Sequence, residues 1–130
     1  MTSISIPPEV RSVAEAVIEK LRDEVRGIKA VLVSTEDGFE LASRVENTAQ
    51  VDRLSAMASS LVVLGALAGE ESSLGQCDSV TIEATSGYII MLQVRHHSMG
   101  LILSVITSRE VVLGQVLYFS KQAAAELQRA

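Results

Sequence analysis

Residues 48–69 constrain the fold most, because they predict one long helix that is apolar on almost every side. Asn47, followed three residues later by Gln50, has the spacing of a capping box and places the helix start near Thr48. At 100° per residue, one apolar face is wide enough to pack on a sheet: Leu54, Met57, Ala58, Leu61, Leu64, Gly65 and Ala68. The opposite face carries a second seam of small and apolar side chains: Ala56, Ser60, Val63 and Leu67. A monomer would leave this predicted seam in water.

Five strands are expected around this helix, at residues 28–34, 39–45, 80–85, 88–94 and 101–106. The second and third alternate apolar with polar residues and belong at the edges, whereas the other three are apolar on both faces. Tight hairpins then favour the order 2-1-5-4-3, numbered along the chain. A helix precedes the strands and ends near Gly27, and Thr107 with Glu110 predicts a capping box that opens a terminal helix. The predicted fold class is α/β, an α+β sandwich: a five-stranded antiparallel sheet with the second helix on one face and the first and third on the other.

The predicted seam suggests a docking surface, and a second copy of the chain related by a two-fold axis would bury both seams at once. The alternative is that the terminal helix or a loop covers it. Thr81 and Glu83 lie on an edge strand, where a second copy could pair; alternatively, Glu83 and the polar loop around Gln76 and Asp78 keep that edge solvated. The spacing of Gly65 and Gly69 predicts close helix packing. The expected homodimer interface is Ala56, Ser60, Val63, Leu67, Thr81 and Glu83.

The length of 130 residues predicts a single domain, residues 1–130, in which residues 1–7 form a flexible tail. The net charge of -5, the four aromatic Tyr and Phe residues and the lack of a Lys/Arg cluster argue against binding nucleic acid. No apolar run reaches spanning length and the N-terminus does not resemble a signal peptide, so we expect no membrane insertion and a cytoplasmic location.

No sequence pattern indicates catalysis or a bound cofactor. Nucleotide-loop, dinucleotide, zinc-hydrolase and serine-hydrolase motifs are absent from the sequence. Cys77 is the single cysteine, which permits no internal disulfide. His96 and His97 adjoin in a predicted turn, where we expect exposed side chains rather than metal ligands. We therefore expect a protein that is not an enzyme and uses no cofactor or metal.

The element order, with residues 31–33 leading into Asp37-Gly38, the apolar helix, the hairpin at 79–87 and Leu113-Gly114 in the last helix, resembles the Roadblock family of dynein light chains. The resemblance implies a homodimer in which the second helix and third strand meet their counterparts to make one continuous sheet. Bacterial relatives bind small Ras-like GTPases, as in gliding motility and polarity systems, and eukaryotic ones scaffold motors or signalling complexes. It therefore implies a dimeric regulator or scaffold for a small Ras-like GTPase, with no catalytic residue carried over. The alternatives are a small-molecule-sensing module and a structural assembly module.

Overall fold

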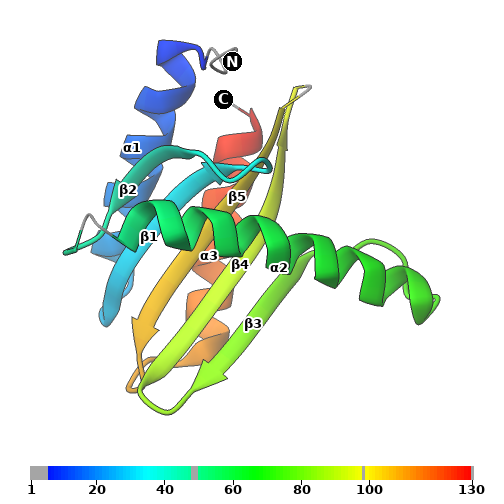
Figure 1. Cartoon of the computed structure of the whole chain (residues 1–130). Helices are drawn as coiled ribbons and strands as arrows, with labels where there is room; N and C mark the ends of the chain where they lie inside the picture. The colour runs from blue at the N-terminus through cyan, green and yellow to red at the C-terminus, as the bar shows by residue number, and fades with distance from the viewer. Residues whose placement is uncertain (1–5, 48–49, 98, 130) are drawn as a thin grey trace.

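The computed structural model describes residues 6–47, 50–97 and 99–129, which form three helices and five strands. In chain order these are α1 (Pro8–Glu24), β1 (Ile28–Thr35), β2 (Glu40–Arg44), α2 (Val51–Glu71), β3 (Ser79–Ala84), β4 (Gly87–His96), β5 (Met99–Ser108) and α3 (Leu113–Arg129). Figure 1 shows α2 crossing one face of the sheet, while α1 and α3 lie on the other face. The predicted element order and the predicted layers are confirmed.

The sheet is antiparallel throughout, in the order β2-β1-β5-β4-β3 that the strand faces predict. β4 and β5 pair along their whole length, from Gly87 opposite Ser108 to His96 opposite Met99. β3 is shorter, and its pairing with β4 ends where Ser79 lies opposite Leu92. β2 and β3 are therefore the edge strands. The C-terminal end of β4, residues 93–96, extends beyond the end of β3.

The larger core lies between the sheet and the α1–α3 layer, where aliphatic side chains such as Leu21, Val33 and Leu103 are fully buried. The predicted tail, residues 1–7, lies outside the described residues except for Ile6 and Pro7, and Ile6 packs against this core. A smaller cluster lies beneath α2: Ala58, Val62, Met91 and Ile102. Most of the apolar burial is thus on the α1–α3 side, and α2 covers its own face of the sheet less completely.

The clean alternation predicted for the second strand is wrong. The pairing of β1 with β2 shifts between Val33 and Ser34, which is a β-bulge that leaves Leu41 as an extra residue. Leu41 and Ala42 are consequently both buried in the α1–α3 core, although simple alternation places them on opposite faces. Phe39, expected on the same face as Leu41, is about half exposed. Arg11 also donates a hydrogen bond to the carbonyl of Leu41, so α1 protects this edge.

The predicted capping box of Thr107 and Glu110 is wrong, whereas that of Asn47 and Gln50 spans residues outside the described ones, as does the expected start at Thr48. α2 begins at Val51, with Gln50 as its N-cap and no side-chain hydrogen bond from Gln50. Thr107 belongs to β5, where it is buried and donates a hydrogen bond to the carbonyl of Ser108. α3 begins only at Leu113, so the Thr-x-x-Glu spacing here spans the end of a strand and a turn.

His96 also differs from its prediction. It ends β4 and is buried, because it shares the core-facing side of the strand with Leu92 and Val94. His97 is exposed, as expected, and its ring makes an edge contact with that of His96. In the stretches that the structure describes, no three His, Cys, Asp or Glu residues gather to form a group that could hold a metal ion.

Candidate dimer and partner interface

The outward face of α2 is the most apolar exposed surface of any described helix. Four large side chains on it are each more than half exposed: Met57, Val63, Leu64 and Leu67. The smaller Ala56 and Ser60 are exposed beside them, so every α2 residue of the predicted seam faces away from the sheet. By length and composition alone, α2 is apolar enough to cross a membrane, in contrast to the expectation from unbroken apolar runs, and only 22% of that stretch is buried in the fold. Such an apolar surface on a helix indicates contact with another apolar surface.

The assignment of Leu64 and Ala68 to the sheet-facing side is wrong, because both are exposed, and Met57 is exposed as well although it borders the sheet beside the helix. The residues buried against the sheet are Val51, Ser55, Ala58 and Val62, with Leu54, Leu61 and Gly65 half-buried beside them. Small side chains at Ser55 and Ala58 let the helix axis approach the strands closely, and the larger side chains then point outward. The exposed apolar surface is consequently wider than the predicted seam.

On one side of α2 the sheet itself is uncovered. Ile82, Ile89 and Ile106 form a half-exposed apolar area on β3, β4 and β5, here called the sheet patch. Met57 projects from α2 toward this side, and Figure 1 shows the lower ends of the three strands extending past the helix. A cavity of about 50 Å³ lies between the helix and the patch. The sheet patch and the outward side chains of α2 therefore form one continuous apolar surface.

On the other side of α2 lies a groove of about 380 Å³ with acidic walls, here called the acidic groove. Val63 and Leu67 line it from the helix, and Glu36 and Asp37 line it from the turn after β1. The Glu36 carboxylate accepts a hydrogen bond from Gln93 at 3.3 Å. Sequence reasoning missed Glu36, because Asp37-Gly38 predicts a turn but does not predict that this turn lies beside α2.

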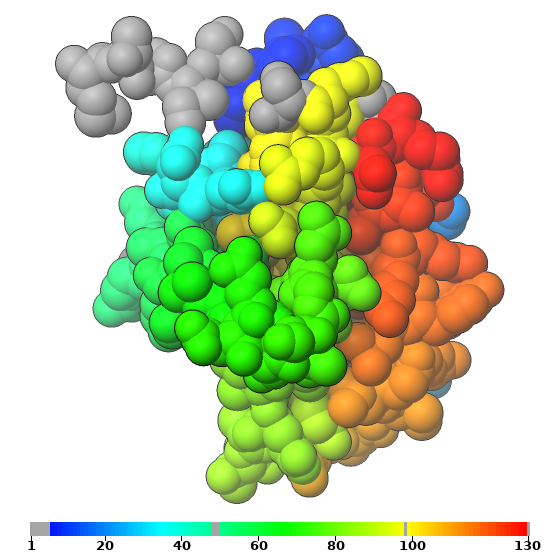
Figure 2. Space-filling model, turned by 90° about the vertical axis from the view of Figure 1, so that its right-hand side faces the viewer, coloured from blue at the N-terminus to red at the C-terminus, as the bar shows by residue number. Residues whose placement is uncertain are grey.

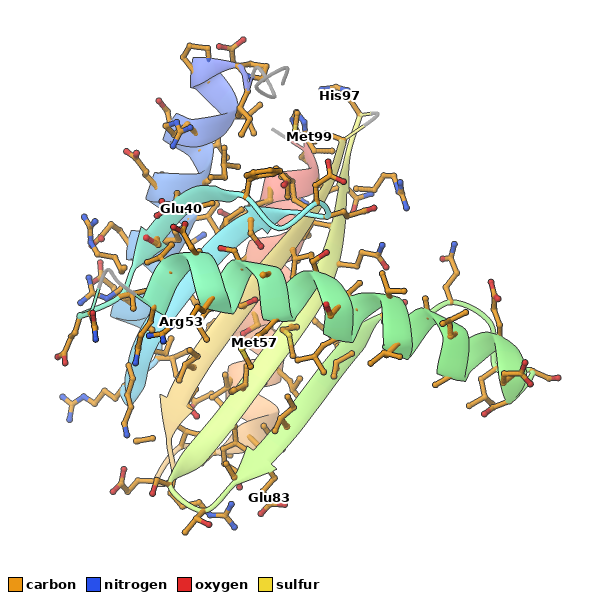
Figure 3. The ribbon with its side chains drawn as sticks, in the orientation of Figure 1. Glu40, Arg53, Met57, Glu83, His97 and Met99 are labelled. Carbon is orange, nitrogen blue, oxygen red and sulfur yellow. The ribbon has the colours of Figure 1, made fainter. Side chains whose placement is uncertain are left out.

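The exposed edge of β3 carries the two predicted interface residues Thr81 and Glu83, and both are exposed. Glu83 forms a 2.6 Å ion pair with Arg109, whose guanidinium also lies 5.1 Å from the centre of the Tyr88 ring (Figure 3 labels Glu83). Its hydrogen bond with Glu83 raises the pKa of Arg109 above its usual range. The ion pair neutralises the one formal charge on β3 and makes this edge more suitable for strand pairing. Sequence reasoning missed Arg109, because only the pairing of three strands brings it to Glu83.

The Gly65 and Gly69 pair packs against a loop and a strand, not against another helix. A Cβ on Gly65 would lie 2.9 Å from both Cys77 Sγ and Val80 Cγ2, and one on Gly69 would lie 2.5 Å from the carbonyl oxygen of Gly75. Close packing at these glycines is thus observed, but against the segment that leads into β3; packing against another helix stays a prediction. α2 crosses β3 where Gly65 meets Val80, and Figure 1 shows the helix continuing past the sheet edge.

Comparison with known proteins agrees with this architecture. The Roadblock/LC7 domain family matches residues 15–106. No curated protein matches the sequence significantly. A Roadblock/LC7 domain from Streptomyces avermitilis is 21% identical, with a TM-score of 0.78, over 88% of this chain and 93% of that one.

Two MglB structures are also similar in fold. MglB from Myxococcus xanthus is 18% identical, with a TM-score of 0.82, over 97% of this chain and 92% of that one. MglB with a tetrameric arrangement is 16% identical, with a TM-score of 0.83, over 99% of this chain and 95% of that one. At identities of 16–21%, the similarity to these three structures establishes the fold alone.

Proposed function

Because this chain belongs to the Roadblock/LC7 domain family, we propose that it is a dimeric, non-enzymatic regulator or scaffold that binds a small Ras-like GTPase and modulates its nucleotide cycle. The main support for a dimer is the continuous apolar surface formed by the outward face of α2 and the adjacent sheet patch. The nucleotide cycle would require GTP, so we propose a cytoplasmic location.

The proposed dimer has a two-fold axis perpendicular to the sheet at the edge of β3. This axis pairs β3 with β3 of the second copy, antiparallel, and keeps both α2 helices on the same face of a continuous sheet. The second α2 then lies beside the first, above the sheet patch, since both helices extend past the β3 edge. Met57, Leu64 and Ala68 are the α2 residues on that side, and Thr81 and Glu83 lie on the paired edge.

The other predicted interface residues have a different place in this arrangement. Val63 and Leu67 line the acidic groove, on the side of α2 away from the two-fold axis. Ala56 and Ser60 lie on the outermost surface of the helix. We therefore propose that these four residues border the helix pair and contribute to a composite surface for the GTPase.

The cavity beneath α2 is too small for a metabolite. Ligand pockets usually enclose about 300–1,000 Å³. The cavity of about 50 Å³ between α2 and the sheet is far smaller, and its lining is almost entirely apolar. This argues against a small-molecule site between α2 and the sheet; the acidic groove of about 380 Å³ is larger but lies on the surface.

The GTPase proposal is tested by affinity capture from the native cell with the wild type and with Leu64→Glu, each in the presence of GTP or GDP. We expect the wild type to enrich a P-loop GTPase in a nucleotide-dependent manner, and the variant to lose it together with the dimer. The captured GTPase, once purified, should show an altered rate of GTP hydrolysis or exchange when the wild type is added. A nucleotide cycle unchanged at saturating wild-type protein would contradict regulation, and recovery of no P-loop protein would contradict the GTPase partner.

A further inference from the structure

The upper end of β4 has an open backbone edge. β5 pairs with β4 as far as His96, whereas β3 pairs with it only as far as Leu92. The outer edge from Gln93 to His96 therefore has no neighbouring strand among the described residues. Four residues of a strand span about 13 Å, which is long enough for a short added strand.

Two hairpins show which backbone groups point to this edge. Ala84 lies opposite Gly87 across a two-residue turn, and His96 likewise lies opposite Met99. Residues that flank a two-residue turn bond to each other, so Gly87 directs its backbone groups toward β3 and His96 directs them toward β5. The direction of the backbone N–H and C=O groups alternates from residue to residue along a strand. Counting from either hairpin, Gln93 and Arg95 direct these groups to the open edge.

The chain's own segment before β3 is held away from this edge. Ser73 and Gly75 have φ of 58° and 87°, which turns the backbone out of the extended conformation. The carbonyl of Gly75 then packs against Gly69, and Cys77 packs against Gly65. These glycine contacts attach the segment to α2 instead of extending β3 along β4.

A cleft of about 790 Å³ runs along the open edge between two helices. Figure 2 shows this face, with the end of α2, the end of β4 and α3 around it. The α2 side of the cleft carries Glu70, and the segment before β3 carries Asp78. The α3 side carries Lys121 together with the small Ala124 and Ala125. The α2 side of the cleft is thus acidic and the α3 side is basic, so each side favours ligand side chains of a different charge.

We propose that this cleft binds an extended segment of a partner protein, which adds to β4 as a short antiparallel strand in the line of β3. Side chains of an added strand alternate between the two faces. Those on the α2 side meet Glu70 and Asp78 and are basic, while those on the α3 side meet Lys121 and the alanines and are acidic or small and apolar. The neighbouring Arg95 is directed toward Glu36, whose carboxylate lies 4.0 Å from its guanidinium.

This proposal goes beyond the proposed dimer and does not depend on it. In the dimer, β3 of the second copy lies beside β3, whereas the added segment continues the line of β3 past Ser79. The two binding modes use different strands.

The test uses the full chain and the peptide acetyl-Lys-Val-Lys-Asp-Lys-amide, with amide hydrogen exchange read by NMR. We expect the peptide to slow exchange at the Gln93 and Arg95 amides by about tenfold or more, and to leave Val94, which bonds to β5, unchanged. N-methylation of the central Lys blocks an amide that faces β4 and should weaken binding about tenfold or more. N-methylation of Val blocks an amide that faces solvent and should change binding by less than about twofold.

Two protein variants separate strand addition from charge attraction. Arg95→Pro removes the outward N–H but keeps the groups that bond to β5, so it should abolish binding, while Arg95→Ala keeps the N–H and should bind. Lys121→Glu should weaken the Asp-containing peptide about tenfold but not its Val counterpart, acetyl-Lys-Val-Lys-Val-Lys-amide. Equal loss with both N-methylated peptides, or no protection at millimolar peptide, would overturn the proposal. Protection of residues 75–78 instead of peptide binding would also overturn it, because it would show that the chain's own segment pairs with β4.

Discussion

Leu64 provides the sharpest test of the proposed dimer, because it is 59% exposed on the side of α2 that faces the two-fold axis. Full burial of a leucine side chain stabilises by about 1.5–3 kcal/mol, so burying the exposed part contributes about 1–2 kcal/mol per copy. Leu64→Ala removes most of this contribution, and the two-fold axis repeats the loss. The dimer should therefore lose about 2–3 kcal/mol, which raises its dissociation constant about 30- to 150-fold.

Sedimentation equilibrium over a range of protein concentrations measures this dissociation constant directly. Val112→Ala is the matched control, because Val112 is 67% exposed next to α3 and lies outside the proposed interface. Leu67→Ala tests the side of α2 that lines the acidic groove and should have a smaller effect than Leu64→Ala. A larger effect of Leu67→Ala would place the interface on the predicted seam instead, and a wild type that is monomeric at micromolar concentration would refute the dimer.

Three further predictions concern stability and ionisation. Gly87→Ala should lower the free energy of unfolding in urea by about 2–4 kcal/mol, because a Cβ there would overlap the backbone carbonyl of Thr107. Leu103→Ala, at a fully buried core position, should cost about 2–5 kcal/mol in the same assay. The Ser108 hydroxyl holds the pKa of Glu110 below its usual range, so Ser108→Ala should raise that pKa in an NMR titration. Since the folded-state pKa is the lowered one, this interaction contributes stability above the usual carboxyl pKa and loses it as the pH falls through the folded-state value.

The strand order was predictable because the polar faces of edge strands leave a clear trace in the sequence. Thr81 and Glu83 face solvent in the fold, whereas β1, β4 and β5 have apolar side chains on both faces. With tight hairpins linking neighbours, few other orders satisfy both conditions. The bulge at Leu41 was not predictable, since it depends on the register between two strands and not on the alternation within one.

The orientation of α2 was predicted only in part, because a helical wheel needs contrast between polar and apolar positions. α2 lacks that contrast, since one arc packs on its own sheet and a second arc is apolar and exposed. Reasoning from hydrophobicity places large residues such as Leu64 inward, although Leu64 is 59% exposed. The fold instead places small residues there, because Ser55 and Ala58 permit the close approach of helix and strands.

Packing at Gly65 and Gly69 determines both the edge of β3 and the open edge of β4. Their missing side chains admit Cys77 and Gly75, so the segment before β3 packs against α2 and leaves the line of β3. Had this segment continued as a strand, β3 would have matched the length of β4, and no open edge would lie between α2 and α3. In the two proposals, β3 provides a short edge for a second copy, and the neighbouring end of β4 provides a separate edge for an extended segment. The packing at these two glycines thus leaves a single sheet with two distinct backbone edges.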